Sequence, residues 1–151
     1  MSDWREHLIE DWPRIAAICR RMRRVAVLGI KPESRASAPA HTVPRYLVAA
    51  GLEVIPVPVY YPELTTILGR PVVRDLTTIE GRLDCVDVFR RSEDVPGHLD
   101  DLVALGPDLV WLQLGIRNDE AAERLARAGI AVVQDRCLLV DHRRALAERS
   151  E

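Results

Sequence analysis

This chain of 151 residues has no long apolar run, few cysteines and no surplus of basic residues. No stretch approaches the roughly 20 apolar residues that a membrane span needs. The three cysteines are odd in number and far apart, which argues against a disulfide framework or a zinc site and indicates a reducing, cytoplasmic setting. A net charge of −2 lacks the basic face of a nucleic-acid binder, and the charged, acidic start is unlike a secretory signal. We therefore expect a protein that binds neither membranes nor nucleic acid.

The full glycine fingerprint of dinucleotide-binding domains is also missing. Residues 24–29 (RVAVLG) are typical of a buried strand that ends in glycine, but two further glycines do not follow. After the second apolar run, where such a domain places an acid for the ribose, the chain reads Pro56–Val57–Pro58–Val59, and the first acid is Glu63. An NAD-type site is disfavoured, whereas an apolar shelf here suits a flat ring or a pantetheine-like chain.

Catalytic groups are few. The four histidines are scattered, only His41 falls in a candidate ligand loop, and no nucleophile–base pair is evident. Cys137 follows the fifth apolar run, yet we favour a buried structural cysteine over a reactive one, because reactive thiols need an accessible, electropositive setting. We assign no catalytic residue and no metal ligand, which makes a non-enzymatic protein the favoured hypothesis and leaves an enzyme open.

What the chain does contain is a regular alternation of strand-like and helix-like segments. Val-rich runs without strict polar alternation predict strands that are buried on both faces. These runs are Val25–Leu28, Val54–Val57, Cys85–Phe89, Leu109–Leu112 and Ala131–Val133. The alternation predicts one α/β domain over residues 1–151: a Rossmann-like, open, five-stranded parallel sheet with helices on both faces, in three αβα layers.

Capping signals predict where the helices lie. We expect starts at Thr42 (with Pro44 in the first turn), Ser92 and Asn118, and ends at Gly51, Gly106 and Gly129. The N-terminal segment, residues 1–23, is expected to form one helix or two, with Pro13 in the first turn of the second. Residues 138–148 are expected to be helical, and residues 60–81 to form a loop with a short helix near 77–80.

Ligands of open parallel sheets bind at the carboxyl ends of the strands. Gly29 and Lys31 follow the first strand and precede a helix whose free N–H groups would favour a phosphate, although one glycine alone favours a plain surface loop with a solvated lysine. Arg90 and Arg91 follow the third strand. Two interpretations are about equally supported: the arginines contact phosphates, or they are ordinary surface residues. Gln113 and Gly115 leave the fourth strand at a position suited to polar contact. Trp111 is expected in the core, and Asn118 is expected to act as a helix cap.

These segments resemble a known family. VAVLGI, PAHTVPRYLVAAGLEVIPVPVYYP, VDVFRRSEDVP and VWLQLGIRNDEAAERLARAGIAVVQDRCLLVDHRR together look like the small single-domain CoA-binding proteins, which are similar to the CoA-binding domain of the succinyl-CoA synthetase α subunit. The match covers roughly residues 20–145. The late motifs FRRSEDVP, WLQLGIRN and QDRC are the specific part of it.

The resemblance implies that coenzyme A binds at the carboxyl ends of the strands. It places the phosphates on the glycine turn and the next helix, the adenosine beside the second strand, and the rest of the ligand along two later segments. The implied binding residues are Gly29, Ile30, Lys31, Pro39, Ala40, His41, Thr42, Val43, Pro56, Val57, Pro58, Phe89, Arg90, Arg91, Gln113, Leu114 and Gly115. Lys31, Ala38, Ala40 and Pro58 depart from the commoner pattern, which has serines in the loop and asparagine after the second strand.

The resemblance does not extend to ligase activity, because the larger ligases carry their phosphorylated histidine in a second domain. We expect a cytoplasmic protein that binds CoA or an acyl-CoA without evident catalysis, with a homodimer or an accessory partner possible. One alternative is an enzyme that acts on a CoA thioester, or a thiol-redox protein that uses Cys137. Another is an interaction module with a vestigial nucleotide pocket.

Overall fold

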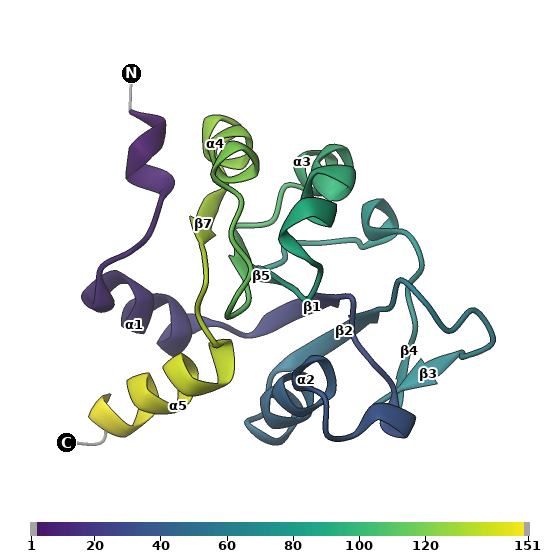
Figure 1. The fold of residues 1–151 in the computed structure, drawn as a ribbon. Coiled ribbons are helices and arrows are strands. Elements are labelled where there is room, and N and C mark those ends of the chain that lie inside the picture. Colours follow the sequence, from purple (N-terminus) through teal and green to yellow (C-terminus); the bar gives the residue numbers. More distant parts are fainter. Residues whose placement is uncertain (1–2, 150–151) are drawn as a thin grey trace.

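The computed structural model describes residues 3–149, which are organised around a sheet of five parallel strands (Figure 1). The strand order is β2-β1-β5-β6-β7, so the direction in which the sheet grows reverses between β1 and β5. The strands are β1 (Arg24–Leu28), β2 (Glu53–Val57), β5 (Cys85–Val88), β6 (Leu109–Leu112) and β7 (Ala131–Val133). All five predicted strands are confirmed, with Phe89 lying just beyond the end of β5.

Helices cover both faces of the sheet, which confirms the three-layer prediction (Figure 1). One face is covered by α1 (Trp12–Arg21), α2 (Pro39–Ala49) and α5 (Leu138–Arg149), and the other by α3 (Leu99–Leu105) and α4 (Asp119–Arg127). Each face has its own cluster of buried apolar side chains. Trp111 is fully buried in the first cluster, as predicted, and its indole N–H donates to the Arg136 carbonyl over 2.8 Å. Within residues 3–149, no helix has the length and apolar character needed to cross a membrane.

Short elements fill the connections. They are the 3-10 helices η1 (Trp4–His7), η2 (Glu33–Arg35), η3 (Leu76–Thr78) and η4 (Ser92–His98), and the two-residue strands β3 (Thr66–Ile67) and β4 (Arg70–Pro71). The N-terminal segment therefore forms two helices, and Pro13 lies in the first turn of the second, as expected. The antiparallel β3–β4 pair lies inside the connection that we expected to be a loop. Strands of two residues are too short to show an alternating pattern, which is why the sequence did not reveal them.

Both edges of the sheet are covered by other parts of the chain. At the β7 edge, Leu8 forms a parallel bridge with Val132, and the N–H of Ile9 donates to the Val132 carbonyl over 2.8 Å. At the β2 edge, Pro56 has no N–H to offer, and its carbonyl accepts a hydrogen bond from Val73 over 2.9 Å. Covered edges of this kind protect a sheet from pairing with another chain.

A carboxyl group lies in the middle of the sheet. Asp87 is in β5, opposite Val27 of β1 and Trp111 of β6, and it is fully buried. Among the residues that the structure describes, neither of its carboxyl oxygens has a hydrogen-bond partner. Burial raises the pKa of Asp87 well above its usual range, because a charged carboxylate is costly to remove from water. Burial therefore favours the neutral form of Asp87 in the folded protein.

Replacing Asp87 by Asn should change how stability depends on pH. Above about pH 4 the unfolded chain releases this proton while the folded protein keeps it, so the wild-type free energy of unfolding falls as the pH rises. The contribution is about 1.4 kcal/mol per pH unit up to the raised pKa. The side chain of Asn cannot titrate. In urea unfolding at pH 5, 6 and 7, the unfolding free energy of Asp87→Asn should therefore rise relative to that of the wild type by about this amount per pH unit. Parallel pH profiles for the two proteins would show that Asp87 is ionised when folded.

Candidate functional site

The carboxyl ends of the strands carry two adjoining hollows. The larger, of about 500 Å³, lies between the start of α2, the segment after β5 and the turn after β6. The smaller, of about 210 Å³, lies between the turn after β1 and the segment after β2. They share one wall, which consists of Lys31, Phe89, Arg90 and Arg91. The structure thus brings together three predicted segments that are far apart in the sequence.

A glycine makes this arrangement possible. Gly29 has a φ of +86°, and its N–H donates to the Val57 carbonyl over 2.8 Å. A β-carbon at this position would overlap the Phe89 carbonyl oxygen and lie 3.4 Å from Cδ of Arg90. The turn after β1 therefore passes directly against the segment that carries the arginines, which only a residue without a side chain allows. Gly29 acts here by permitting a close approach between two strand ends.

Gly29→Ala should be much more harmful than Gly51→Ala. Both glycines have positive φ angles, +86° and +94°, so alanine is strained at either position. Nothing lies within 4 Å of a β-carbon at Gly51, so that variant should lose only about 1–2 kcal/mol of unfolding free energy. At Gly29 the overlap with Phe89 should cost about 1–3 kcal/mol more. Urea unfolding measures both, and equal losses would contradict the close approach.

A proline inside α2 anchors the loop that carries Lys31. Pro44 lacks the N–H that would normally bond to the carbonyl of Ala40, four residues earlier. That carbonyl instead accepts a hydrogen bond from the N–H of Lys31 over 3.1 Å. The Lys31 carbonyl in turn lies 2.9 Å from Nδ1 of His41. The backbone of Lys31 is therefore tied to the first turn of α2 at two points.

The predicted start of this helix at Thr42 is wrong. The helix begins at Pro39, which occupies the first helical position, where its missing N–H costs nothing. Ala38 is the N-cap and supplies no side-chain hydrogen bond, while its carbonyl accepts from the N–H groups of His41 and Thr42. For the N–H of Ala40, the described residues supply no acceptor. We mistook the cap because threonine is a good N-cap residue and alanine a poor one.

The position of this cap has a direct test. Ala38→Ser adds the missing side-chain acceptor and should raise the free energy of unfolding by about 1 kcal/mol. Thr42→Ala, one turn into the helix, should change it by less than about 0.5 kcal/mol. Thermal and urea unfolding of the two variants provide the comparison. If Thr42→Ala changes the unfolding free energy more than Ala38→Ser does, Thr42 and not Ala38 is the N-cap.

The cations of the shared wall differ in their surroundings. Asp94 lies between the two arginines: its Oδ2 is 3.7 Å from Nη2 of Arg90 and 3.0 Å from Nε of Arg91. Glu93 adds a second pair with Arg91 over 3.5 Å. Lys31 forms no ion pair with any of residues 3–149 and is only half-buried. Lys31 is therefore the cation of this wall whose charge is not already matched.

Several expected binding residues lie away from the hollows. His41 and Val43 are buried in α2, and Pro56, Val57 and Pro58 belong to β2 and its buried end. Gln113 is also buried, and its Oε1 accepts a hydrogen bond from the first N–H of α5, at Leu138, over 3.1 Å. Leu114 and Gly115, next in the chain, do line the larger hollow. Gln113 therefore holds the β6 turn against α5.

The walls also contain residues that are not among the implied binding residues. The smaller hollow is lined by Val59, Tyr60 and Tyr61, one to three residues beyond Pro58, and the larger by Glu93 and Ile116. Tyr60 is 63% exposed, and its ring lies 5.6 Å from the guanidinium of Arg90. The signal in the sequence was the pair of tyrosines directly after an apolar strand. Tyrosine there is equally common on an ordinary surface, so the pattern alone did not assign it.

The cysteines lie outside the two hollows. Cys19 and Cys85 are buried, and burial raises the pKa of Cys19 to about 12. Cys137 is half-buried in the turn between β7 and α5 and lies on the wall of neither hollow.

Asn118 caps α4 as predicted, its side chain accepting from the N–H of Ala121 over 3.0 Å. Across residues 3–149, no group of three His, Cys, Asp or Glu side chains is placed to hold a metal ion.

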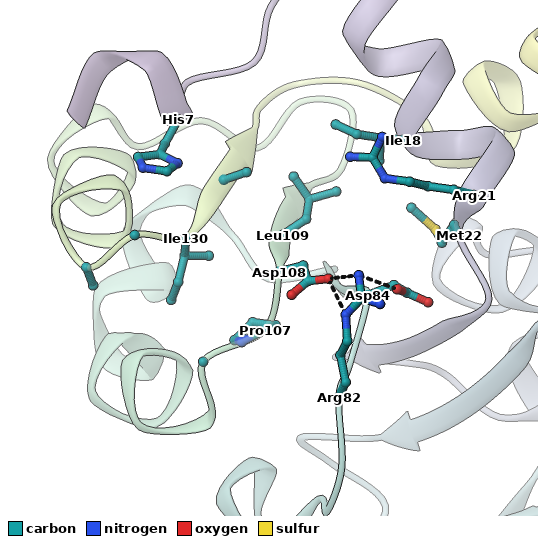
Figure 2. Close-up of a pocket in the computed structure, with 14 residues that line it drawn as sticks. His7, Ile18, Arg21, Met22, Arg82, Asp84, Pro107, Asp108, Leu109 and Ile130 are labelled. Carbon is teal, nitrogen blue, oxygen red and sulfur yellow. Dashed lines mark hydrogen bonds and ion pairs between the residues drawn. The ribbon is translucent and has the colours of Figure 1, made fainter. Parts of the chain in front are cut away.

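A further hollow, of about 430 Å³, lies at the amino ends of β6 and β7 (Figure 2). Ile18 of α1 and Met22, the C-cap residue of that helix, face Leu109 and Ile130 across it (Figure 2). Its two acids, Asp84 and Asp108, both pair with Arg82, over 3.7 and 2.5 Å. Because parallel sheets bind their ligands at the opposite edge, we place the candidate site at the carboxyl ends.

The sheet order, the helical layers and the hollows at the switch point define a Rossmann-like α/β domain with a candidate ligand site at its strand ends. Residues 23–143 match the model of a family described as "CoA binding domain". The chain belongs to this family.

The chain is also similar to several known proteins. The uncharacterised protein YneT of Bacillus subtilis is 36% identical over 128 residues, which cover 85% of this chain and 91% of YneT. A solved structure from Thermus thermophilus, "cell-free ID.343", is 39% identical with a TM-score of 0.81, covering 90% of this chain and 99% of that one. A dinucleotide-forming acetyl-coenzyme A synthetase of Candidatus Korarchaeum cryptofilum matches at 17% identity and a TM-score of 0.59, covering 75% of this chain and 26% of the synthetase. This last similarity shows a shared fold alone.

Proposed function

We propose that the protein binds coenzyme A, free or acylated, in the two hollows at the carboxyl ends of the strands. The observation that carries the proposal is Lys31, an unpaired cation on the wall that the two hollows share, in a chain that belongs to the CoA binding domain family. The nearby N–H of Ala40, in the first turn of α2, adds a donor suited to a phosphate oxygen.

The shape and chemistry of the site support a ligand in which two parts with extensive apolar surface are joined by phosphates. Val59 and Tyr60 give one hollow an apolar wall, and Leu114 and Ile116 do the same for the other. Leu114 is 68% exposed, so a ligand that covers it gains by burying apolar surface. Coenzyme A has this design, with an adenosine and a pantetheine arm on either side of its diphosphate. The cations between the hollows would meet the phosphates.

Calorimetry on ligand-free protein should show binding of CoA, and Lys31→Ala should weaken it about tenfold, the effect of one charge-assisted hydrogen bond. Pantetheine, which has no phosphate, should bind equally to both proteins. Arg45→Ala removes an exposed cation of α2 outside the hollows and is the matched control. If wild-type protein binds no CoA at millimolar concentration, the proposal fails, and if Lys31→Ala binds as well as the wild type, the lysine has no phosphate contact.

The composition offers an independent readout. Lys31 is the only lysine of the chain, the other basic residues being arginine. Its amine therefore reacts with trinitrobenzenesulfonate without interference from other lysines, and peptide mass spectrometry reads the rate at that position. Bound CoA should slow the reaction, whereas pantetheine at saturation should slow it much less.

A further inference from the structure

Arg90 is held from three sides by residues of this chain. Its Nε lies 3.2 Å from Nε2 of His98, and its Nη2 lies 3.7 Å from Oδ2 of Asp94. The ring of Tyr60 lies 5.6 Å from the guanidinium carbon. Asp94 and His98 are four residues apart in η4, so one short element supplies both polar partners. Arg90 is 16% exposed, far less than Arg91 at 75%.

These contacts use one edge of the guanidinium. Nε and Nη2 lie on the same edge of the planar group, and both face η4 through His98 and Asp94. For Nη1, residues 3–149 supply no acceptor. Arg90 lines both hollows, so the end of the group that carries Nη1 is the part left to meet a ligand.

We propose that Asp94 and His98 are positioning residues that hold Arg90 so that its free end meets a phosphate oxygen of the ligand. This inference rests on the proposed function and deepens it, because it adds a second cation to Lys31 and names what fixes it. A long arginine side chain loses rotamer freedom when it is ordered, which opposes binding. If the contacts with η4 already order Arg90 in the ligand-free protein, this loss of side-chain entropy does not weaken ligand binding.

The contact requires one particular form of His98. The Nε–H of an arginine only donates, so Nε2 of His98 must accept, and the imidazole must be neutral with its proton on Nδ1. The charged groups that face His98 are Arg90 after β5, Asp94 in η4 and Asp101 in α3. Burial and then Arg90 lower the pKa of His98 below its usual 6.5. The contact is therefore intact at neutral pH, and acid removes it by protonating His98 next to the arginine.

Two substitutions at His98 separate positioning from mere packing. His98→Ala removes the acceptor, and CoA should bind about five- to tenfold more weakly at pH 7.5. His98→Gln places an uncharged oxygen near the position of Nε2 and should restore binding to within about twofold. As the pH falls through the lowered pKa of His98, the affinity of the wild type should fall relative to that of His98→Gln, because only the wild type gains a charge at this position. Titration of the phosphates of CoA affects both proteins equally and cancels in this ratio.

The outcomes distinguish this inference from the proposed function. If the wild type binds no CoA, both fail. If the wild type binds CoA and His98→Ala binds it equally well, the proposed function stands and the positioning role is overturned. Pantetheine, which lacks the phosphates, should bind all three proteins alike, and a parallel loss of pantetheine binding would also overturn the role.

A second measurement does not depend on a ligand or on the folding of His98→Ala. Nitrogen-15 chemical shifts of the His98 ring should show the Nδ1–H form at pH 7.5. In Arg90→Ala the pKa of His98 should rise, because one cause of its depression is gone. His142, whose pKa is lowered by burial and by Arg23, is the internal control and should not move. An unchanged His98 titration in Arg90→Ala would overturn the contact on which the inference depends.

Discussion

The missing side chain at Gly29 is the constraint on which the site depends. Because no β-carbon separates them, the turn after β1 and the segment after β5 lie against one another at the switch point of the sheet. Lys31 and Arg90 come from these two segments and therefore face the same pair of hollows. In a dinucleotide-binding domain the first glycine serves the tight turn and later ones admit the pyrophosphate. Here the single glycine brings two cation-bearing strand ends together.

An imperfection in a helix completes the arrangement. Pro44 removes one bond from the ladder of α2, and the carbonyl it leaves free becomes the anchor for the Lys31 loop. A proline within a helix is usually costly, because both the bond and the space for the ring are lost. In this chain the loop recovers the bond, so the backbone carbonyl stays satisfied. The position of the lysine thus depends on a residue thirteen places away.

The sequence was sufficient for the five-stranded sheet because each strand is a short, mostly apolar run with a glycine close to it in the chain. It was less informative about the site, since hollows depend on which loops meet. Lys31, Arg90 and Leu114 line the larger hollow, because they closely follow strands whose carboxyl ends share one edge. Gln113 also follows a strand, yet its side chain turns inward to α5. No local pattern separates Gln113 from Leu114, since the direction of each side chain is set by the packing of a distant helix.

The predicted helix start at Thr42 and the expected apolar shelf at Pro56–Pro58 illustrate two different limits of prediction from sequence. At Thr42, intrinsic capping preference pointed to one residue, while proline geometry and the loop anchor fixed the start three residues earlier. At Pro56–Pro58, the Val73 segment covers the edge of β2 and the three residues are buried, and the hollow is lined by the residues that follow them. At both places the arrangement depends on tertiary contacts that a local pattern does not show.

The two covered sheet edges constrain how this protein can assemble. A second copy, or a peptide in an extended conformation, would need to displace Leu8 and Ile9 from β7, or Val73 from Pro56, before it could add a strand. Each displacement would leave backbone groups without partners. Association by sheet extension is therefore disfavoured at both ends, and the helical layers and loop surfaces are the faces left for contact with other molecules.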